Sequence, residues 1–223
     1  MDTTQRLTLA GGVVVLAGVA SALAAPALPD SVVTHWNAAG EPDGTMAKSV
    51  ALAFLPALSA VLVVLFALAP RIDPLGANVE SFCPAYDWFI VAVATFVLVL
   101  HTGVIAFNLG YEFDVTLLVI AGVAALFYAV GELLTRAEPN WFVGIRTPWT
   151  LSSEAVWERT HELGGWLFKL TAVVSLIGLF FGDAAVYFLV VPALLTAAIT
   201  LAYSYYQYRR LENGTESPSD TGV

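Results

Sequence analysis

The sequence predicts an all-α integral membrane protein with six transmembrane helices. Of its 223 residues, 58% are hydrophobic and only 12% are charged, whereas soluble domains carry about 25% charged residues. The mean hydropathy is +0.78. The apolar residues gather in six runs of roughly membrane-spanning length, separated by polar segments. Composition and patterning together predict a multi-pass protein of the cell membrane.

The first apolar run, Leu7–Ala25, has the length of a transmembrane helix. Its alanine-rich end also resembles a signal-peptidase site, which leaves a cleaved signal peptide as an alternative. We favour an uncleaved helix, because the run is long for a signal peptide and only Arg6 precedes it as a basic residue. In both cases the next segment, Pro26–Ser49, lies outside. Its proline and glycine residues predict a compact loop, and the β-branched residues of Ser31–Trp36 predict a short extended piece.

Five further runs complete the predicted bundle. They are Val50–Ala69, Tyr86–Leu109, Val115–Leu134, Gly164–Phe181 and Ala184–Tyr206. The tight turns expected at residues 110–114 and 182–183 predict two helical hairpins. We divide the chain into an N-terminal membrane domain, residues 1–70, and a second membrane domain, residues 71–210. Residues 211–223 are polar and predict a disordered tail.

Basic residues predict the orientation of these helices. If six helices alternate in direction, most Lys and Arg residues fall on one side of the membrane: Arg6, Arg71, Arg136, Arg146, Arg159, Arg209 and Arg210. Lys48 falls on the other side, and Lys169 lies inside a helix. Because cytoplasmic loops are enriched in Lys and Arg, this distribution predicts that both termini are cytoplasmic.

The polar segment Asn140–Gly165, between the fourth and fifth transmembrane helices, falls on the same cytoplasmic side. It holds three of the six Trp residues, which is typical of a folded cap and not of a disordered linker. From residue 152 to residue 163 its spacing predicts a short amphipathic helix. Glu154, Glu158 and Glu162 form one acidic face of that helix.

The opposite face of the amphipathic helix carries Trp157 and His161. Two interpretations are open for it. In the first, its aromatic residues anchor the helix in the membrane interface. In the second, Arg146, Trp149, Trp157 and His161 form a docking surface for a peptide or a protein.

Two charged residues lie within predicted spans, Glu132 near the inner end of the fourth helix and Lys169 about two turns into the fifth. Because an isolated charge is costly in a bilayer, we expect an intramembrane ion pair. A proton or ion path would need more carboxylates along the spans. His101, in the outer half of the third helix, is interpreted as a hydrogen-bonded contact between helices.

The sequence gives little support for catalysis, metal binding or nucleic-acid binding. The net charge of −9 argues against a nucleic-acid surface, and the single Cys83 excludes an internal disulfide. The outer loop holds potential ligands whose spacing matches no metal motif: Asp30, His35, Glu41 and Asp43. We therefore predict no metal, no cofactor and no enzymatic activity. The remaining enzyme hypothesis uses His161 with Glu158 or Glu162 on a lipid or peptide substrate.

Two blocks of the sequence resemble known families. Residues 28–44, LPDSVVTHWNAAGEPDG, followed by Lys48, resemble a small membrane domain of unknown function built around LPxxVPxHWNxxGxPD, although Val33 stands where that pattern has Pro. Residues 140–152, NWFVGIRTPWTLS, followed by Val156-Trp157, Thr160-His161 and Gly164, resemble the SdpI family. That family commonly joins the two blocks in this order.

The resemblance implies a polytopic immunity protein. Proteins of this type protect a producing cell from a secreted toxic peptide and hold a DNA-binding autorepressor at the membrane. The implied peptide-binding residues of the outer loop are His35, Trp36, Asn37, Gly40 and Asp43. The implied partner-binding residues on the cytoplasmic side are Asn140, Gly144, Arg146, Pro148, Trp149, Trp157 and His161. A small transporter or channel, which would use the charged residues within the spans, is the alternative.

Overall fold

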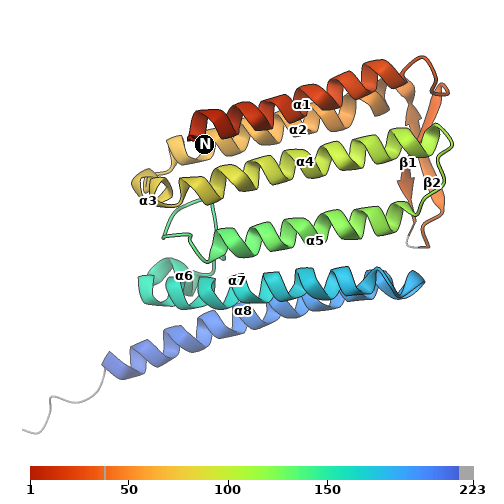
Figure 1. Ribbon diagram of the computed structural model, residues 1–223. Helices are drawn as coiled ribbons and strands as arrows, with labels where there is room; N and C mark the ends of the chain where they lie inside the picture. Colours follow the sequence, from red (N-terminus) through yellow and green to blue (C-terminus); the bar gives the residue numbers. More distant parts are fainter. Residues whose placement is uncertain (38, 216–223) are drawn as a thin grey trace, which may run out of the picture.

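The structure is a computed structural model that describes residues 1–37 and 39–215, a bundle of long helices with a β-hairpin at one end (Figure 1). Its elements are α1 (Thr3–Ala24), β1 (Ser31–Trp36), β2 (Pro42–Ala47), α2 (Lys48–Ile72), α3 (Gly76–Ser81), α4 (Cys83–Asn108), α5 (Val115–Leu134), α6 (Pro148–Ser152), α7 (Glu154–Gly178), a 3₁₀ turn (Gly182–Ala184) and α8 (Ala185–Thr215). The predicted, mainly helical architecture is confirmed.

Within the described residues, five helices are long and apolar enough to cross a membrane: α1, α2, α4, α5 and the helix from the 3₁₀ turn through α8. The protein is therefore a multi-pass membrane protein. The sixth long helix, α7, has 25 residues but a charged first half. It differs from the prediction, because the amphipathic helix and the fifth apolar run form one continuous helix. Gly164 and Gly165 lie in its middle and do not break it.

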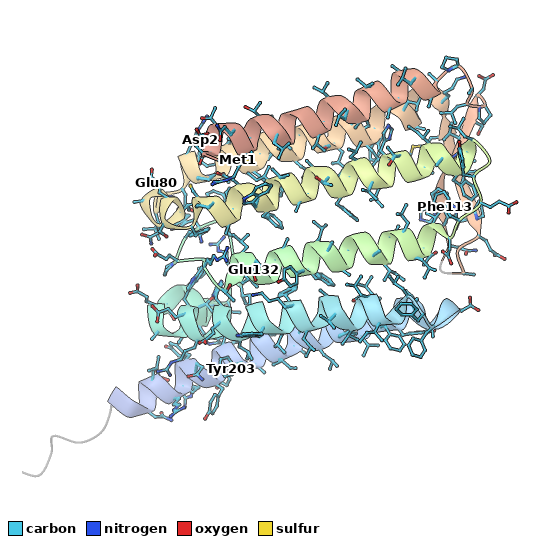
Figure 2. The ribbon with its side chains drawn as sticks, viewed as in Figure 1. Met1, Asp2, Glu80, Phe113, Glu132 and Tyr203 are labelled. Carbon is cyan, nitrogen blue, oxygen red and sulfur yellow. The ribbon has the colours of Figure 1, made fainter. Side chains whose placement is uncertain are left out.

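The two ends of the bundle differ in what they carry. In Figure 1, α1 begins at the end where α8 finishes, and the β-hairpin lies at the other end. Figure 2 places Met1, Asp2 and Glu80 at the first end and Phe113 at the second. We call these the termini-bearing end and the hairpin end. The irregular segment between α5 and α7, with the short helix α6, lies at the termini-bearing end (Figure 1).

The helices form two groups that meet between α4 and α5. One group contains α1, α2 and α4, and the other contains α5, α7 and α8. In the second group, α5 and α7 approach closely because they meet at glycines. A Cβ atom on Gly165 would lie 2.4 Å from Cγ2 of Thr135 and 2.9 Å from the carbonyl oxygen of Gly131. Small residues at such crossings are typical of helix packing in membranes.

The β-hairpin departs from the all-α prediction, which anticipated only an extended piece at Ser31–Trp36. Strands β1 and β2 pair antiparallel, with Val32 opposite Met46. The free edge of β1 is held by Asn108 at the end of α4. The Asn108 amide donates to the carbonyl oxygen of Val33 (2.9 Å) and accepts from the N–H of the same residue (2.8 Å). The Asn108 side chain thus takes the hydrogen-bonding place of a neighbouring strand at Val33 and fixes the hairpin to the bundle.

The chain remains helical beyond the point where a disordered tail was expected. Helix α8 continues to Thr215, five residues into the segment 211–223. The rest of that segment, residues 216–223, lies outside the described residues.

Candidate functional site

The site is built on the segment between α5 and α7, whose irregular backbone is organised by Asn140. This side chain is buried and makes four hydrogen bonds. Its amide nitrogen donates to the carbonyl oxygens of Glu138 (2.8 Å) and Val143 (2.9 Å). Its oxygen accepts from the N–H groups of Phe142 (2.9 Å) and Val143 (2.6 Å). Asn140 therefore satisfies a turn that has no secondary structure of its own.

The same segment is anchored to the other helix group through the link between α2 and α3. The Asp73 carboxylate accepts from the N–H of Trp141 (2.9 Å) and from the N–H of Leu75 (2.8 Å). The Asn78 amide donates to the carbonyl oxygen of Pro139 (2.7 Å). The bonds to Trp141 and Pro139 join residues more than sixty positions apart and hold the segment across the termini-bearing end.

The segment is also latched to α7 by Trp157 and His161. The Trp157 indole N–H donates to the carbonyl oxygen of Ala137 (2.7 Å). The His161 ring stacks on the Trp157 ring, with 3.9 Å between centroids, and its Nε2 accepts from the N–H of Ile145 (2.9 Å). A Cβ atom on Gly144, whose φ is +130°, would lie 2.3 Å from this Nε2. Only glycine fits there.

The hydrogen bonds of His161 define its protonation state. Since Nε2 accepts from Ile145, the proton of the neutral ring sits on Nδ1, which donates to the carbonyl oxygen of Trp157 (2.8 Å). Burial lowers the pKa of His161 to about 4, although the bond to Trp157 partly offsets this effect. The ring is therefore neutral at pH 7, and neither nitrogen is free to act as a base on a substrate.

Three of the residues predicted to bind a partner are buried. Trp157 and His161 are 1% and 2% exposed, and Asn140 is 2% exposed, so these three residues hold the segment in place. Trp149 is half-buried against Tyr205 of α8, with 5.0 Å between ring centroids. Arg146 is exposed.

Pro148 is also exposed and begins the short helix α6. Thr147 caps α6 in a reciprocal pair with Thr150 and donates to the Ser204 hydroxyl of α8 (3.2 Å). Exposed apolar side chains complete this surface: Trp141, Phe142 and Leu151. The face that remains available to a partner is thus the outer side of the segment.

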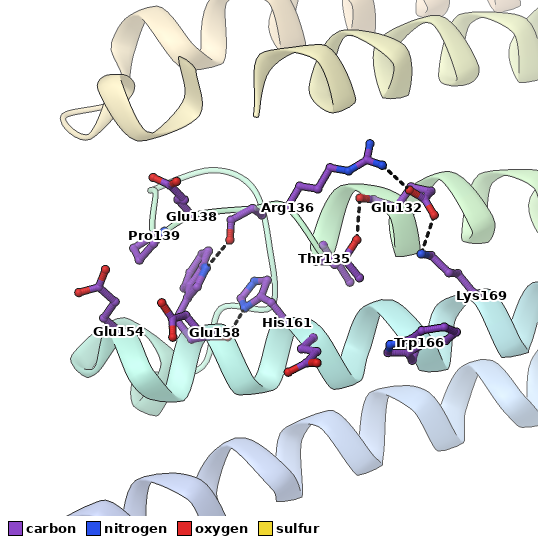
Figure 3. A pocket seen from close by; sticks show the side chains of 14 residues that line it. Glu132, Thr135, Arg136, Glu138, Pro139, Glu154, Glu158, His161, Trp166 and Lys169 are labelled. Carbon is purple, nitrogen blue, oxygen red and sulfur yellow. Dashed lines mark hydrogen bonds and ion pairs between the residues drawn. The ribbon is translucent and has the colours of Figure 1, made fainter. Parts of the chain in front are cut away.

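A polar cleft of about 810 Å³ opens beside the segment, between the end of α5 and the first half of α7 (Figure 3). Its basic residues are Arg136 and Lys169. Its acidic residues are Glu132, Glu138, Glu154, Glu158 and Glu162. Five carboxylates against two cations give the cleft an acidic character at neutral pH.

The inner part of this cleft holds an ion pair between α5 and α7. A Glu132 carboxylate oxygen lies 2.5 Å from Nζ of Lys169, and the other lies 3.0 Å from a guanidinium nitrogen of Arg136. The ammonium group also lies 5.5 Å and 6.0 Å from the ring centroids of Trp166 and Tyr128. The Glu132 carboxylate thus pairs with two cations, and the rings of Tyr128 and Trp166 lie within cation–π distance of the ammonium group.

At the hairpin end, the implied ligand residues occupy the exposed tip of the β-hairpin. His35 Nδ1 lies 2.5 Å from an Asp43 carboxylate oxygen, and both side chains are largely exposed. The Asn37 side-chain oxygen accepts from two backbone N–H groups of the tip, and Gly40 adopts a φ of +78°. Trp36 instead turns inward and packs edge-to-face on Phe107 of α4, at 5.1 Å.

The sequence analysis did not identify another ion pair between helices, which is more deeply buried than the Glu132–Lys169 pair. Arg6 of α1 lies 3.1 Å from the Asp87 carboxylate of α4, whose side chain is 4% exposed. The sequence signal was Asp87 at the start of the third apolar run, together with Arg6 just before the first apolar run. His101 does make the interhelical contact that was predicted, because its Nε2 lies 2.7 Å from the Ser21 hydroxyl of α1.

Across residues 1–37 and 39–215, no three His, Cys, Asp or Glu side chains converge in a way that could hold a metal ion.

Comparison with known proteins identifies both blocks of the sequence. Residues 136–204 match the SdpI/YfhL protein family, and residues 12–60 match a domain of unknown function, DUF1648. The immunity protein SdpI of Bacillus subtilis (strain 168) is 23% identical over 189 residues, which cover 84% of this chain and 88% of that protein. No solved structure is significantly similar. The resemblance to the SdpI family predicted from the sequence is confirmed.

Acid should weaken the contacts through which His161 holds the segment against α7. The unfolded chain binds a proton at this residue near pH 6.5 and the folded protein only near pH 4. The stabilisation from neutral His161 is fully present above pH 6.5 and is lost as the pH falls toward 4, by about 3 kcal/mol. We expect His161→Gln to be less stable than the parent protein at pH 7 but to lose less stability over this range. Unfolding followed by circular dichroism in detergent measures both curves, and parallel curves would contradict the assignment.

The Glu132–Lys169 pair, which is partly buried, should show some of the asymmetry of a buried ion pair. Lys169→Met keeps the side-chain stem but leaves Glu132 with Arg136 alone, so we expect the free energy of unfolding to fall by about 2 kcal/mol. Replacing both residues, Glu132→Leu with Lys169→Met, removes the stranded charge and should cost less. Equal losses in the single and double variants, measured by unfolding in mixed detergents, would show that the pair contributes no coupling.

Proposed function

We propose that this protein is a non-enzymatic, SdpI-like membrane protein that gives immunity to a toxic peptide and signals by holding a transcriptional repressor at the membrane. The observation that carries the proposal is the pair of ordered caps at opposite ends of the bundle. The segment between α5 and α7 is hydrogen-bonded to both helix groups, and the hairpin is hydrogen-bonded to α4 and lies close to α5. Such an arrangement is expected of a protein that relates events on the two sides of a membrane. The similarity to an immunity protein gives independent support.

The hairpin is the proposed peptide-binding cap. Its exposed tip presents the His35–Asp43 pair and the polar turn around Asn37. The base of the hairpin is held by Asn108 of α4. Its tip approaches α5, since a Cβ atom on Gly40 would lie 3.2 Å from the Thr116 hydroxyl. A peptide that contacts the tip would therefore act on α4 and α5, the two helices where the groups meet.

The outer side of the segment between α5 and α7, together with the polar cleft, is the proposed partner-binding cap. It combines the exposed Trp141 and Phe142 with the acidic cleft. A protein that binds nucleic acid carries a basic surface. The net negative cleft is complementary to such a surface, and exposed aromatic residues are typical anchors of protein interfaces.

We further propose that six helices cross the membrane and that both termini are cytoplasmic. The connectivity supports this topology, because α5 ends at the termini-bearing end while α8 begins at the hairpin end (Figure 1). The chain between them has to traverse the bundle, and α7 is the element that does so. The distribution of basic residues supports the orientation.

Cysteine labelling tests the orientation. In a Cys83→Ala background, an impermeant thiol reagent applied to intact cells should modify Glu112→Cys and leave Arg146→Cys unmodified until the membrane is opened. Both positions are exposed in the fold, so they form a matched pair at opposite ends. Reaction of Arg146→Cys in intact cells would reverse the proposed roles of the two caps.

A transporter or channel is the second candidate, and the Glu132–Lys169 pair at the inner part of the polar cleft favours it. Proton or ion flux in proteoliposomes that Glu132→Gln abolishes would support transport. The absence of flux would remove this candidate and leave the immunity proposal untouched.

Deletion of the gene should make cells several-fold more sensitive to a membrane-active peptide from a competing or producing strain. Complementation with Asp43→Asn should restore immunity only in part, because it removes the charge beside His35.

Glu158→Lys should restore immunity but release the repressor, whereas Glu112→Lys, with the same charge change at the other end, should retain it. Growth at graded peptide concentrations and fractionation of the repressor measure these outcomes. Unchanged sensitivity of the deletion strain to such peptides would contradict the proposal.

A further inference from the structure

A second cleft, distinct from the polar one, separates the two helix groups at the termini-bearing end. Its volume is about 640 Å³. It is lined by α2, α4 and α5, by residues 142–145 of the segment, and by Phe168 of α7. None of the lining residues is charged, and the hydroxyl of Tyr86 is the one polar side-chain group among them. That hydroxyl already donates to the carbonyl oxygen of Phe66 (2.8 Å).

A space of this size and composition has to be filled by something apolar. Protein interiors are packed with few voids larger than a water molecule, and a void costs free energy because its walls lose their contacts. Water is a poor occupant, since it requires two to four polar partners and the Tyr86 hydroxyl is already engaged. The lining therefore favours a hydrocarbon occupant over water.

The position of the cleft identifies the source of the hydrocarbon. Several of its lining residues are also exposed on the outer surface of α2, among them Leu65 (56%) and Ile72 (66%). Helix α2 is long and apolar enough to cross the membrane, so this surface faces lipid. The cleft is thus continuous with the lipid-facing surface, and it lies at the depth of the leaflet next to the termini-bearing end.

We propose that the cleft binds one hydrocarbon chain of a membrane lipid from that leaflet. The chain enters past Leu65 and Ile72 and lies between α2 and α5, against Leu133 and Phe168. It fills the space between the two helix groups at the level where the Asp73 and Asn78 hydrogen bonds join them. This lipid site is independent of the proposed immunity function, although residues 142–145 of the segment form one of its walls.

A filling substitution tests the site. Ala69 lines the cleft, whereas Ala57 lies on the exposed face of the same helix outside it. The full chain is extracted mildly from phosphatidylglycerol bilayers, and retained lipid is counted by native mass spectrometry. We expect one lipid per wild-type chain, a loss of about tenfold in Ala69→Phe, and no loss in Ala57→Phe. Equal retention in the two variants, or no retained lipid in the wild type, would overturn the proposal.

Photolabelling of the wild-type protein gives a readout that does not depend on how Ala69→Phe folds. The probe is phosphatidylglycerol with a diazirine on one palmitoyl chain. Label should concentrate on residues 65–72 and 130–134, the two walls of the cleft, and excess unlabelled phosphatidylglycerol should compete for it. Label spread evenly over the lipid-facing helices would show that the chain only bathes the surface and would refute a bound lipid.

Discussion

The structure at the termini-bearing end depends on the hydrogen bonding of an irregular backbone next to a membrane. A segment without helix or strand structure leaves N–H and C=O groups that must find partners, and this requirement is strict where water is scarce. Asn140 satisfies the turn from within, Asp73 and Asn78 satisfy it from α2–α3, and His161 satisfies it from α7. The conformation of the segment therefore depends on hydrogen bonds from three parts of the chain: the segment itself, the α2–α3 region and α7. The same bonds require the neutral form of His161 and the absence of a side chain at Gly144.

Hydrogen bonds join the two helix groups at the termini-bearing end, and the hairpin brings them close at the other end. An apolar cleft lies between the groups near the termini-bearing end. The hairpin comes from the N-terminal half but contacts α5, and the segment before α7 comes from the C-terminal half but binds α2–α3. In the proposed function, a peptide outside and a repressor inside would each favour one arrangement of these contacts. Linkage then requires reciprocity: if the peptide strengthens binding of the repressor, the repressor strengthens binding of the peptide by the same factor.

Much of the fold follows from sequence because apolar runs and tight turns are local signals. Except for its last residue, each of the runs Leu7–Ala25 and Tyr86–Leu109 falls within one helix, α1 and α4 respectively. Only the first strand of the hairpin could be predicted, because β2 is poor in β-branched residues. Residues Pro42–Ala47 form a strand because they pair with β1. The burial of Trp157 and His161 could not be predicted for a related reason. Helical spacing tells which residues share a face but not which distant segment will cover that face.

Helix α7 belongs to the bundle although, unlike the other long helices, it lacks a stretch apolar enough by itself to indicate a membrane span. Its lipid contact is limited because α5 and α8 pack along it, so it tolerates polar residues that would be costly on an isolated span. Thr171 of α7 lies 2.9 Å from Thr196 of α8, and Ser175 donates to the carbonyl oxygen of Phe188 (3.3 Å). Lys169 is paired with Glu132 on the side of α5. These three polar groups thus each have a partner on a neighbouring helix, and the low hydropathy of α7 is compatible with the proposed sixth crossing.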